Sequence, residues 1–307
     1  MFTILHSPQQ WHYPSHQNSS KSPPSPSLPL IISSHQNSPA NNRTAENTRR
    51  SSPAGKIKRL ALTQQSRTKL NNNPDRDFYE YPRFVTHVDK NFILNLTDLY
   101  RETLRPEMEI LDLMSSWVSH LPVEVEYRKV VGHGLNAQEL ARNPRLNYFL
   151  VKDLNKEQEF EMEGDCFDAV LCTVSVQYLQ QPEKSKKRAH FNWSKKRVDF
   201  NWVFAEIFRI LRPGGVFIVS FSNRLFYEKA VSAWRDGTAY SRVQLVVEYF
   251  QCIEGFTQPQ VIRKLPHTNG DESSSIFGRI KGLLGLLTGS DPFYAVIAYK
   301  NFKPVYE

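Results

Sequence analysis

The feature that most constrains the fold is a regular alternation of short apolar runs and helical periodicities, which begins near Asp75. Apolar runs of roughly four to eight residues predict buried strands, and apolar residues at helical spacing predict amphipathic helices. The predicted strands lie at 108–113, 128–131, 148–151, 167–174 and 216–221, and the predicted helices at 88–100, 136–142 and 203–211. Thr86 or Asp89 is the expected N-cap of the first helix, and Pro106 is expected to follow its end. Strands and helices that alternate in this way favour a parallel sheet with helices on both faces.

The alternation ends in the last part of the chain. A helix is predicted at 242–252, and two further strands are predicted at 260–265 and 293–300 without a clear crossover helix between them. Adjacent strands without a crossover favour an antiparallel pair at the edge of the sheet. In sheets of this kind, ligands bind outside the carboxyl ends of the strands, where the strand order reverses.

The first 74 residues have a different composition from the rest. They contain nine of the nineteen prolines, thirteen serines, nine basic residues and one acid, and the pentapeptide Ser-His-Gln-Asn-Ser occurs at both 15–19 and 34–38. With almost no apolar periodicity, such a segment buries too little surface to offset its ordering entropy, so we expect a disordered tail and a folded domain at 75–307. A serine-rich, basic and acid-poor N-terminus is typical of an organelle transit peptide, and a disordered cytosolic tail is the alternative.

The net charge of +8 comes from two segments rather than from the body of the chain. Residues 1–74 carry +8 and residues 185–202 carry +5, so the remainder carries −5. The basic balance is therefore no evidence for a nucleic-acid-binding fold. Three scattered cysteines (Cys166, Cys172 and Cys252) indicate neither a disulfide framework nor a metal site, and they favour a reducing compartment. No apolar run reaches the length of a transmembrane helix.

The most specific motif is a helix that ends in Leu-Arg-Pro-Gly-Gly and runs directly into a strand, over residues 204–220. Together with Phe-Asp-Ala-Val at 167–170 and Asp112 at the end of the first strand, it resembles the class I S-adenosylmethionine-dependent methyltransferases of the type-11 kind. The resemblance covers about residues 78–302. It looks closest to a plant and bacterial branch with the loop Asp-Leu-Met-Ser-Ser-Trp-Val-Ser-His-Leu-Pro, here at 112–122. It implies an α/β fold: a Rossmann-like, seven-stranded, mostly parallel sheet with an antiparallel C-terminal strand pair, and S-adenosyl-L-methionine as cofactor.

The loop after the first strand departs from the wider family. Most members have glycines there, which let the backbone approach the cofactor, whereas this chain has Met-Ser-Ser-Trp at 114–117. The resemblance implies that Asp112 faces the amino group of the cofactor and that Ser115 and Ser116 replace the glycines. A helix is expected to follow, with its first N–H groups favouring an anionic group such as the methionine carboxylate. Trp117 is expected in the core rather than in the site.

The end of the second strand departs as well. Most members have an acid there that binds both ribose hydroxyls, and this chain has Gly134. Ribose recognition is then expected from His133, from backbone or from Asn136, and a partly exposed loop histidine is the alternative for His133. Asp153 either accepts from the adenine amino group or is an N-cap or turn residue. The complete set of predicted cofactor-binding residues is Asp112, Ser115, Ser116, Gly132, His133, Gly134, Asp153 and Thr173.

Methyl transfer from a sulfonium requires little catalytic machinery of the protein. The cofactor carries the reactive group, and the protein aligns the acceptor and excludes water. A base is needed only for a protonated acceptor, and no catalytic triad is visible, so no catalytic residue is assigned. The main acceptor-side candidates are Gln177, Tyr178 and Asn223; Ser222 and Arg224 follow the fifth strand, and Tyr79 and Tyr81 could form an N-terminal lid.

Residues 185–202 form two tandem nine-residue repeats, Ser-Lys-Lys-Arg-Ala-His-Phe-Asn-Trp and Ser-Lys-Lys-Arg-Val-Asp-Phe-Asn-Trp. In the branch that the chain resembles, Pro-Glu-Lys runs directly into Val-Phe-Ala-Glu, so the repeat separates Lys184 from Val203. We expect a solvated insertion, arising from a duplication or a gene-model error, because long surface insertions cost little closure entropy. Stacking of its aromatic residues on nucleic acid is the alternative.

Three hypotheses of function follow from these residues. The first is methyl transfer to a small-molecule acceptor, with no nucleic acid and no membrane span involved. The second is a non-catalytic protein of the same fold that serves as a binding or scaffold module. The third is a basic nucleic-acid-associated protein. The loop at 114–117 and Gly134 discriminate the first two. The resemblance to a plant branch makes the chloroplast the expected location, with the cytoplasm as the alternative.

Overall fold

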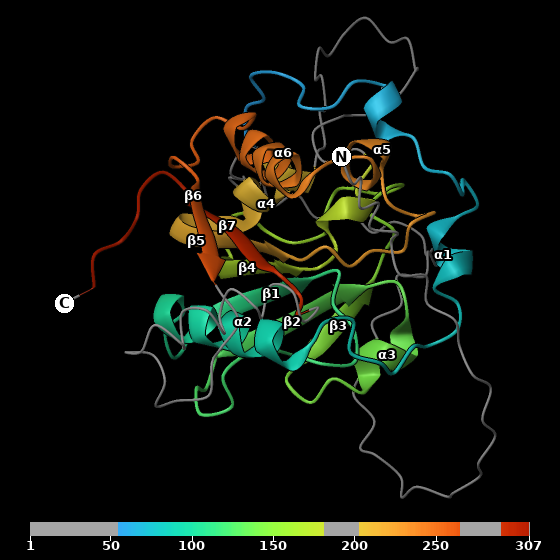
Figure 1. Cartoon of the computed structure of the whole chain (residues 1–307). Coiled ribbons are helices and arrows are strands. Elements are labelled where there is room, and N and C mark those ends of the chain that lie inside the picture. The colour runs from blue at the N-terminus through green and yellow to red at the C-terminus, as the bar shows by residue number, and fades with distance from the viewer. Residues whose placement is uncertain (1–54, 181–202, 265–289, 307) are drawn as a thin grey trace, which may run out of the picture.

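A computed structural model describes residues 55–180, 203–264 and 290–306 of the 307-residue chain (Figure 1). The predictions made for residues 1–54 and for the repeat at 185–202 lie outside the described residues. The predicted boundary at Asp75 lies inside them.

The core of the molecule is one seven-stranded sheet with the order β3-β2-β1-β4-β5-β7-β6. The strands are β1 (Glu109–Leu113), β2 (Lys129–Gly134), β3 (Tyr148–Val151), β4 (Phe167–Thr173), β5 (Leu211–Phe221), β6 (Gln260–Lys264) and β7 (Phe293–Tyr299). All neighbours are parallel except β5–β7 and β6–β7, which are antiparallel. The predicted fold class is confirmed: this is a Rossmann-like sheet with an antiparallel C-terminal pair. Its strand order reverses at β1 and β4, the position where such sheets bind ligands.

Helices cover both faces of the sheet (Figure 1). The helices are α1 (Asp75–Phe78), α2 (Lys90–Thr103), α3 (Ala137–Ala141), α4 (Val203–Ile210), α5 (Ser232–Arg235) and α6 (Ala239–Gln251). Because successive strand residues point to opposite faces, Ile110 packs with α2 and α3 while Leu111 packs with α4 and α6. Asp89 is the N-cap of α2, as one of the two predictions had it, and its carboxylate accepts the Phe92 N–H at 2.8 Å.

The connection between β1 and β2, residues 114–128, contains no helix, so the expected helix after the first strand is absent. Met114 turns the chain directly after β1 with a positive φ of 56°, and Pro122 interrupts the segment with a residue that lacks an N–H group. The face of the sheet that such a helix would cover is covered by α2, which precedes β1. The predicted anion site at the N-terminus of that helix therefore does not exist.

Residues 55–74, which the sequence analysis placed in the tail, are packed against the body, so the described packing begins twenty residues before the predicted boundary at Asp75. Ile57 forms a β-bridge with Ile253, the Lys58 N–H donates to the Cys252 carbonyl at 2.8 Å, and Leu62 is only 3% exposed. Much of the attachment comes from polar groups, because Arg67 and Lys69 are both buried. Hydropathy does not detect such an anchor.

In the described parts of the chain, no helix is long and apolar enough to cross a membrane, and no cluster of histidine, cysteine and acidic side chains could hold a metal ion. The three cysteines are free thiols; Cys172 and Cys252 are buried.

Candidate functional site

A cavity of about 170 Å³ lies over the carboxyl ends of β1, β2, β3 and β4. Asp112, Gly134, Asp153 and Thr173 line it at or just after the four strand ends. Its other walls come from residues 79–88, which precede α2, and from residues 114–121 after β1. The strand ends that the sequence predicted to converge are thus brought together.

Asp112 contributes a carboxylate without a cation. Ser115 Oγ donates to its Oδ2 at 2.6 Å, and within the described residues it has no ion-pair partner. Burial raises the pKa of Asp112 to about 6, although the hydrogen bond from Ser115 opposes the shift. A carboxylate in this state would be stabilised in its charged form by an ammonium group in the cavity.

Gly134 is required by packing. A Cβ on Gly134 would lie 2.7 Å from the backbone oxygen of Ser115, because the Ser115 N–H donates to the His133 carbonyl at 2.6 Å and holds the loop against β2. No carboxylate side chain fits at position 134. Gly132 lies outside the cavity wall, and a Cβ there would meet Leu146 Cδ1 at 2.3 Å. The cofactor contact at Gly132 stays a prediction, although Gly132 is not among the residues that line the cavity.

His133 is a strand residue and is 1% exposed, so the alternative of an exposed loop histidine is wrong. Its Nδ1 accepts the Met114 N–H at 3.3 Å, which leaves the proton on Nε2. Burial lowers the pKa of His133 to about 4, so the ring is neutral. In the described part of the chain Nε2 has no hydrogen-bond partner within bonding geometry.

The loop after β1 is attached to its surroundings through side chains. Ser116 Oγ donates to Glu139 Oε2 at 2.6 Å, and the Trp117 indole N–H donates to the Val85 carbonyl at 3.1 Å. Trp117 is partly exposed and packs edge-on against Phe84. It therefore holds the loop against residues 79–88 of the cavity wall and is not a core residue. Glu139 lines the cavity and was not predicted.

Asp153 and Asn136 both line the cavity, but their polar atoms have local partners. Asp153 Oδ1 accepts the Asn155 N–H at 2.9 Å, which is the turn role considered for it. Asn136 caps α3 by accepting from the backbone of Gln138 and Glu139, and its amide donates to the carbonyls of Tyr79 and Glu80. Asn136 is therefore not free to bind a ribose.

Thr173 belongs to a short chain of hydroxyl groups below the cavity. Ser220 Oγ donates to Thr173 Oγ1 at 3.4 Å, and Thr173 Oγ1 lies 2.9 Å from the hydroxyl of Tyr100. Tyr100 is a core-facing residue of α2 that also lines the cavity. Its helical spacing indicated only a core position, so sequence reasoning assigned it no role in the site.

Of the seven residues predicted on the acceptor side, three line the cavity and four do not. Tyr79, Tyr178 and Arg224 line the cavity, and the Tyr178 hydroxyl accepts the Phe226 N–H at 2.9 Å. The remaining four lie outside it: Gln177 and Ser222 are buried, Asn223 is exposed, and Tyr81 is 76% exposed.

Two further histidines of the cavity wall were not predicted. Burial lowers the pKa of His120 to about 4 and also lowers the pKa of His87, whose ring lies edge-on to Phe226. Both rings are neutral near pH 7.

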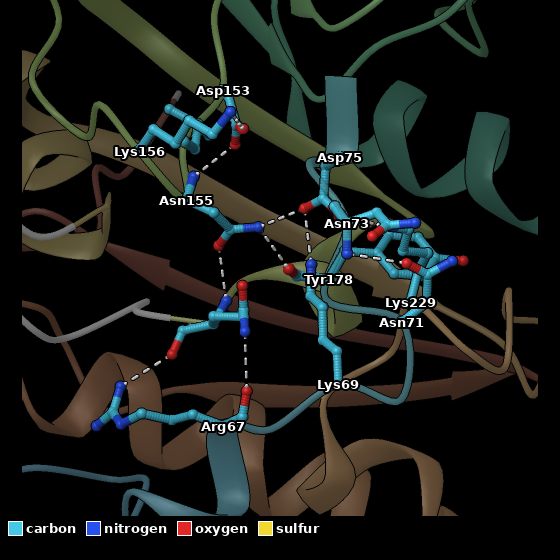
Figure 2. A network of polar contacts seen from close by, with 12 residues as sticks. Arg67, Lys69, Asn71, Asn73, Asp75, Asp153, Asn155, Lys156, Tyr178 and Lys229 are labelled. Atoms are coloured by element: carbon cyan, nitrogen blue, oxygen red, sulfur yellow. Dashed lines mark hydrogen bonds and ion pairs between the residues drawn. The ribbon is translucent and has the colours of Figure 1, made fainter. Parts of the chain in front are cut away.

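A buried charged cluster fixes the N-terminal segment beside the cavity (Figure 2). Asp75 Oδ2 lies 2.7 Å from Lys69 Nζ and its Oδ1 lies 3.2 Å from Lys229 Nζ, with both lysine side chains almost completely buried. The Asn155 amide donates to Asp75 Oδ2 at 2.8 Å and to the Tyr178 carbonyl at 2.9 Å. Burial alone would raise the pKa of Asp75, but the two ammonium groups and the Asn155 amide hold it below its usual value.

Neither a protein-family model nor a curated protein matches the chain. Among solved structures, it is similar to an S-adenosylmethionine-dependent methyltransferase from Mesorhizobium loti, at 16% identity over 66% of this chain and 96% of the other, with a TM-score of 0.39. It is also similar to phosphoethanolamine N-methyltransferase 2 of Haemonchus contortus in complex with S-adenosyl-L-methionine, at 16% identity over 73% of this chain and 59% of the other, with a TM-score of 0.41. A third is an S-adenosylmethionine-dependent methyltransferase from Thermotoga maritima, at 16% identity over 74% of this chain and 95% of the other, with a TM-score of 0.41.

All three are methyltransferases by name. Because their TM-scores lie below 0.5, they indicate no site residue, substrate or partner of this chain. The residues that line the cavity are therefore the basis for a proposed function.

Proposed function

We propose that this protein binds S-adenosyl-L-methionine and transfers its methyl group to a small-molecule acceptor. The observation that carries the proposal is Asp112: a carboxylate at the reversal point of a Rossmann-like sheet that lines the cavity and has no cation partner among the described residues. Ligands of such sheets bind at this point, and the methionine end of the cofactor carries the ammonium group that Asp112 lacks.

The residues present fit the cofactor at its methionine end. Asp112 would hold the ammonium group, and Ser115 would keep the carboxylate oriented through its 2.6 Å hydrogen bond. The ribose end departs from the family pattern because Gly134 has no room for an acid. When bound, the cofactor supplies a methyl group on a sulfonium that is displaced in line.

The acceptor side of the cavity supplies shape and a means of proton removal. Tyr79, Tyr178 and Phe226 form an aromatic wall that would orient an acceptor and exclude water. His87 and His120 are neutral, so either ring could take the proton of a hydroxyl acceptor.

Calorimetric titration of the full chain with S-adenosylmethionine and with S-adenosylhomocysteine tests the proposal. We expect Asp112→Asn to weaken binding roughly tenfold to a hundredfold, because a charge-assisted hydrogen bond contributes about 1.5–3 kcal/mol. Asp236→Asn is the matched control, since Asp236 is exposed and paired with Arg235 away from the cavity. A wild-type chain that binds neither ligand at millimolar concentration would favour the non-catalytic scaffold instead.

We also propose import into chloroplasts. The support is the composition of the N-terminal tail, serine-rich, basic and nearly free of acids. A fluorescent protein carrying this tail should accumulate in chloroplasts of plant cells, and a diffuse cytosolic signal would contradict the proposal.

A further inference from the structure

Glu139 is a buried carboxylate of the cavity wall that has no role so far. It is 7% exposed and lies at the third position of α3, where a glutamate commonly turns back to the N-cap residue. Here its two oxygens have other donors: Oε1 accepts the Arg83 N–H and Oε2 accepts the Ser116 hydroxyl, both at 2.6 Å. The side chain is thus directed into the junction of the two loops that wall the cavity.

The charge of Glu139 is not neutralised by the protein. In the part of the chain that the structure describes, Glu139 forms no ion pair. Its carboxylate accepts from two neutral donors, the backbone N–H of Arg83 and the hydroxyl of Ser116. An ionised carboxylate has about four acceptor sites, so one lone pair remains on each oxygen. Two adjacent free acceptor sites on one carboxylate match two adjacent hydroxyl donors, as a vicinal diol presents them.

The position of Glu139 agrees with this chemistry. It lies five residues beyond Gly134, on the helix that starts directly after β2. The other groups considered for a ribose are occupied or inaccessible: Asn136 holds the carbonyls of Tyr79 and Glu80, and no side chain fits at Gly134. His133 Nε2 is a single donor, which can donate to one hydroxyl oxygen but cannot accept from either hydroxyl of a diol.

We infer that Glu139 binds the two ribose hydroxyls of the cofactor and supplies from α3 the carboxylate that Gly134 cannot. The inference rests on the proposed cofactor. It assigns Asp112 and Glu139 to opposite ends of that molecule, the ammonium end and the ribose end. Ligands that contain only one of these ends can therefore separate the two assignments.

The test measures equilibrium binding of 5′-methylthioadenosine, which has the ribose but no methionine end, and of its 2′,3′-dideoxy analogue. Wild-type protein should prefer the diol by about tenfold or more, since hydrogen bonds to a charged group contribute about 1.5–3 kcal/mol. Glu139→Gln should reduce this preference to about twofold while binding the dideoxy analogue as the wild type does. Asp112→Asn is the matched control: it should weaken S-adenosylhomocysteine but leave methylthioadenosine unchanged.

A purely structural Glu139 would give a different pattern. Glu139→Gln would then weaken both nucleosides equally, in parallel with its melting temperature, and the inference would be overturned. A wild-type chain that binds S-adenosylhomocysteine without any preference for the diol overturns it as well, with no variant needed. Failure of the wild type to bind either S-adenosylhomocysteine or methylthioadenosine would instead overturn the proposed function, and this inference with it.

Discussion

The cluster of Lys69, Asp75 and Lys229 predicts a large asymmetry between two substitutions. Asp75 is the carboxylate partner of both ammonium groups, and the side chains of Lys69 and Lys229 are only 2% and 1% exposed. Asp75→Asn would leave two buried charges without a counterion. Breaking a buried ion pair from one side costs about 3–5 kcal/mol, so we expect at least that loss in the free energy of unfolding.

Lys69→Met should cost far less. It leaves Asp75 and Lys229 as a balanced pair at 3.2 Å and fills the space of the lysine stem with an apolar side chain. Replacement of buried charge by apolar volume is often neutral, so we expect a loss within about 1 kcal/mol. Urea denaturation of both variants measures the difference: with slopes of about 2–3 kcal/mol/M, Asp75→Asn should lower the midpoint by roughly 1–2 M and Lys69→Met by less than about 0.5 M.

A comparison of wild type with Lys69→Met also predicts a pH dependence. Burial lowers the pKa of Lys69 from 10.5, an effect that Asp75 only partly offsets. Between the folded and unfolded pKa values the unfolded chain binds more protons, so this lysine makes the folded state relatively more stable as pH rises. The stability of wild type relative to Lys69→Met should therefore increase as pH rises toward 10.5, the ordinary pKa of a lysine side chain. Equal urea midpoints for Asp75→Asn and Lys69→Met would refute the expected asymmetry, because they would show that Asp75 does not neutralise both lysines as the structure places them.

Three further outcomes are expected. A chain that begins at Asp75 should melt well below one that begins at Gly55, because it lacks the buried anchors of the N-terminal segment; equal melting temperatures in a thermal scan would restore the original boundary. Binding of S-adenosylmethionine should strengthen as pH rises through about 6, because the Asp112 carboxyl must be ionised to hold an ammonium group; calorimetry that shows a flat profile would exclude that role. Gly134→Asp should lower the melting temperature without tightening cofactor binding, since its Cβ would meet a backbone oxygen at 2.7 Å, and tighter binding would contradict the packing.

The sheet could be predicted because its signals are local. The apolar runs predicted the seven strands of the described sheet with ends that differ from the observed ones by at most five residues, and the lack of a clear helical pattern in the sequence between the last two predicted strands indicated the antiparallel edge formed by β6 and β7 (Phe293–Tyr299). In each case, neighbouring residues in the sequence carry the pattern that the structure uses. The Leu-Arg-Pro-Gly-Gly motif was assigned to a helix end and a turn before a strand at 216–221, but β5 (Leu211–Phe221) begins five residues earlier, directly after α4 (Val203–Ile210), and contains the motif.

The errors arose where distant residues decide. The polar segment before Asp75 looked like tail because hydropathy cannot show that Lys69 meets Lys229 and Asp75 in the folded chain. The expected helix after β1 was wrong because α2 covers that face of the sheet instead. Glu139 resembled an ordinary residue of a helix start, and only the approach of Arg83 and Ser116 shows that it belongs to the cavity.

The docking of residues 55–74 also has a consequence for the order of events at the ribosome. The backbone N–H of Lys58 donates to the carbonyl of Cys252, and the backbone N–H of Gly55 donates to the carbonyl of Ala205. At about 5–20 residues per second, the partner of Lys58 is synthesised roughly 10–40 s after Lys58 itself. During that interval the part of the chain that pairs with Ile57 in the folded protein has not been synthesised. The segment has a polar composition, which is why hydropathy did not identify it as part of the fold. The same composition means that it exposes little apolar surface for aggregation before its partners are synthesised.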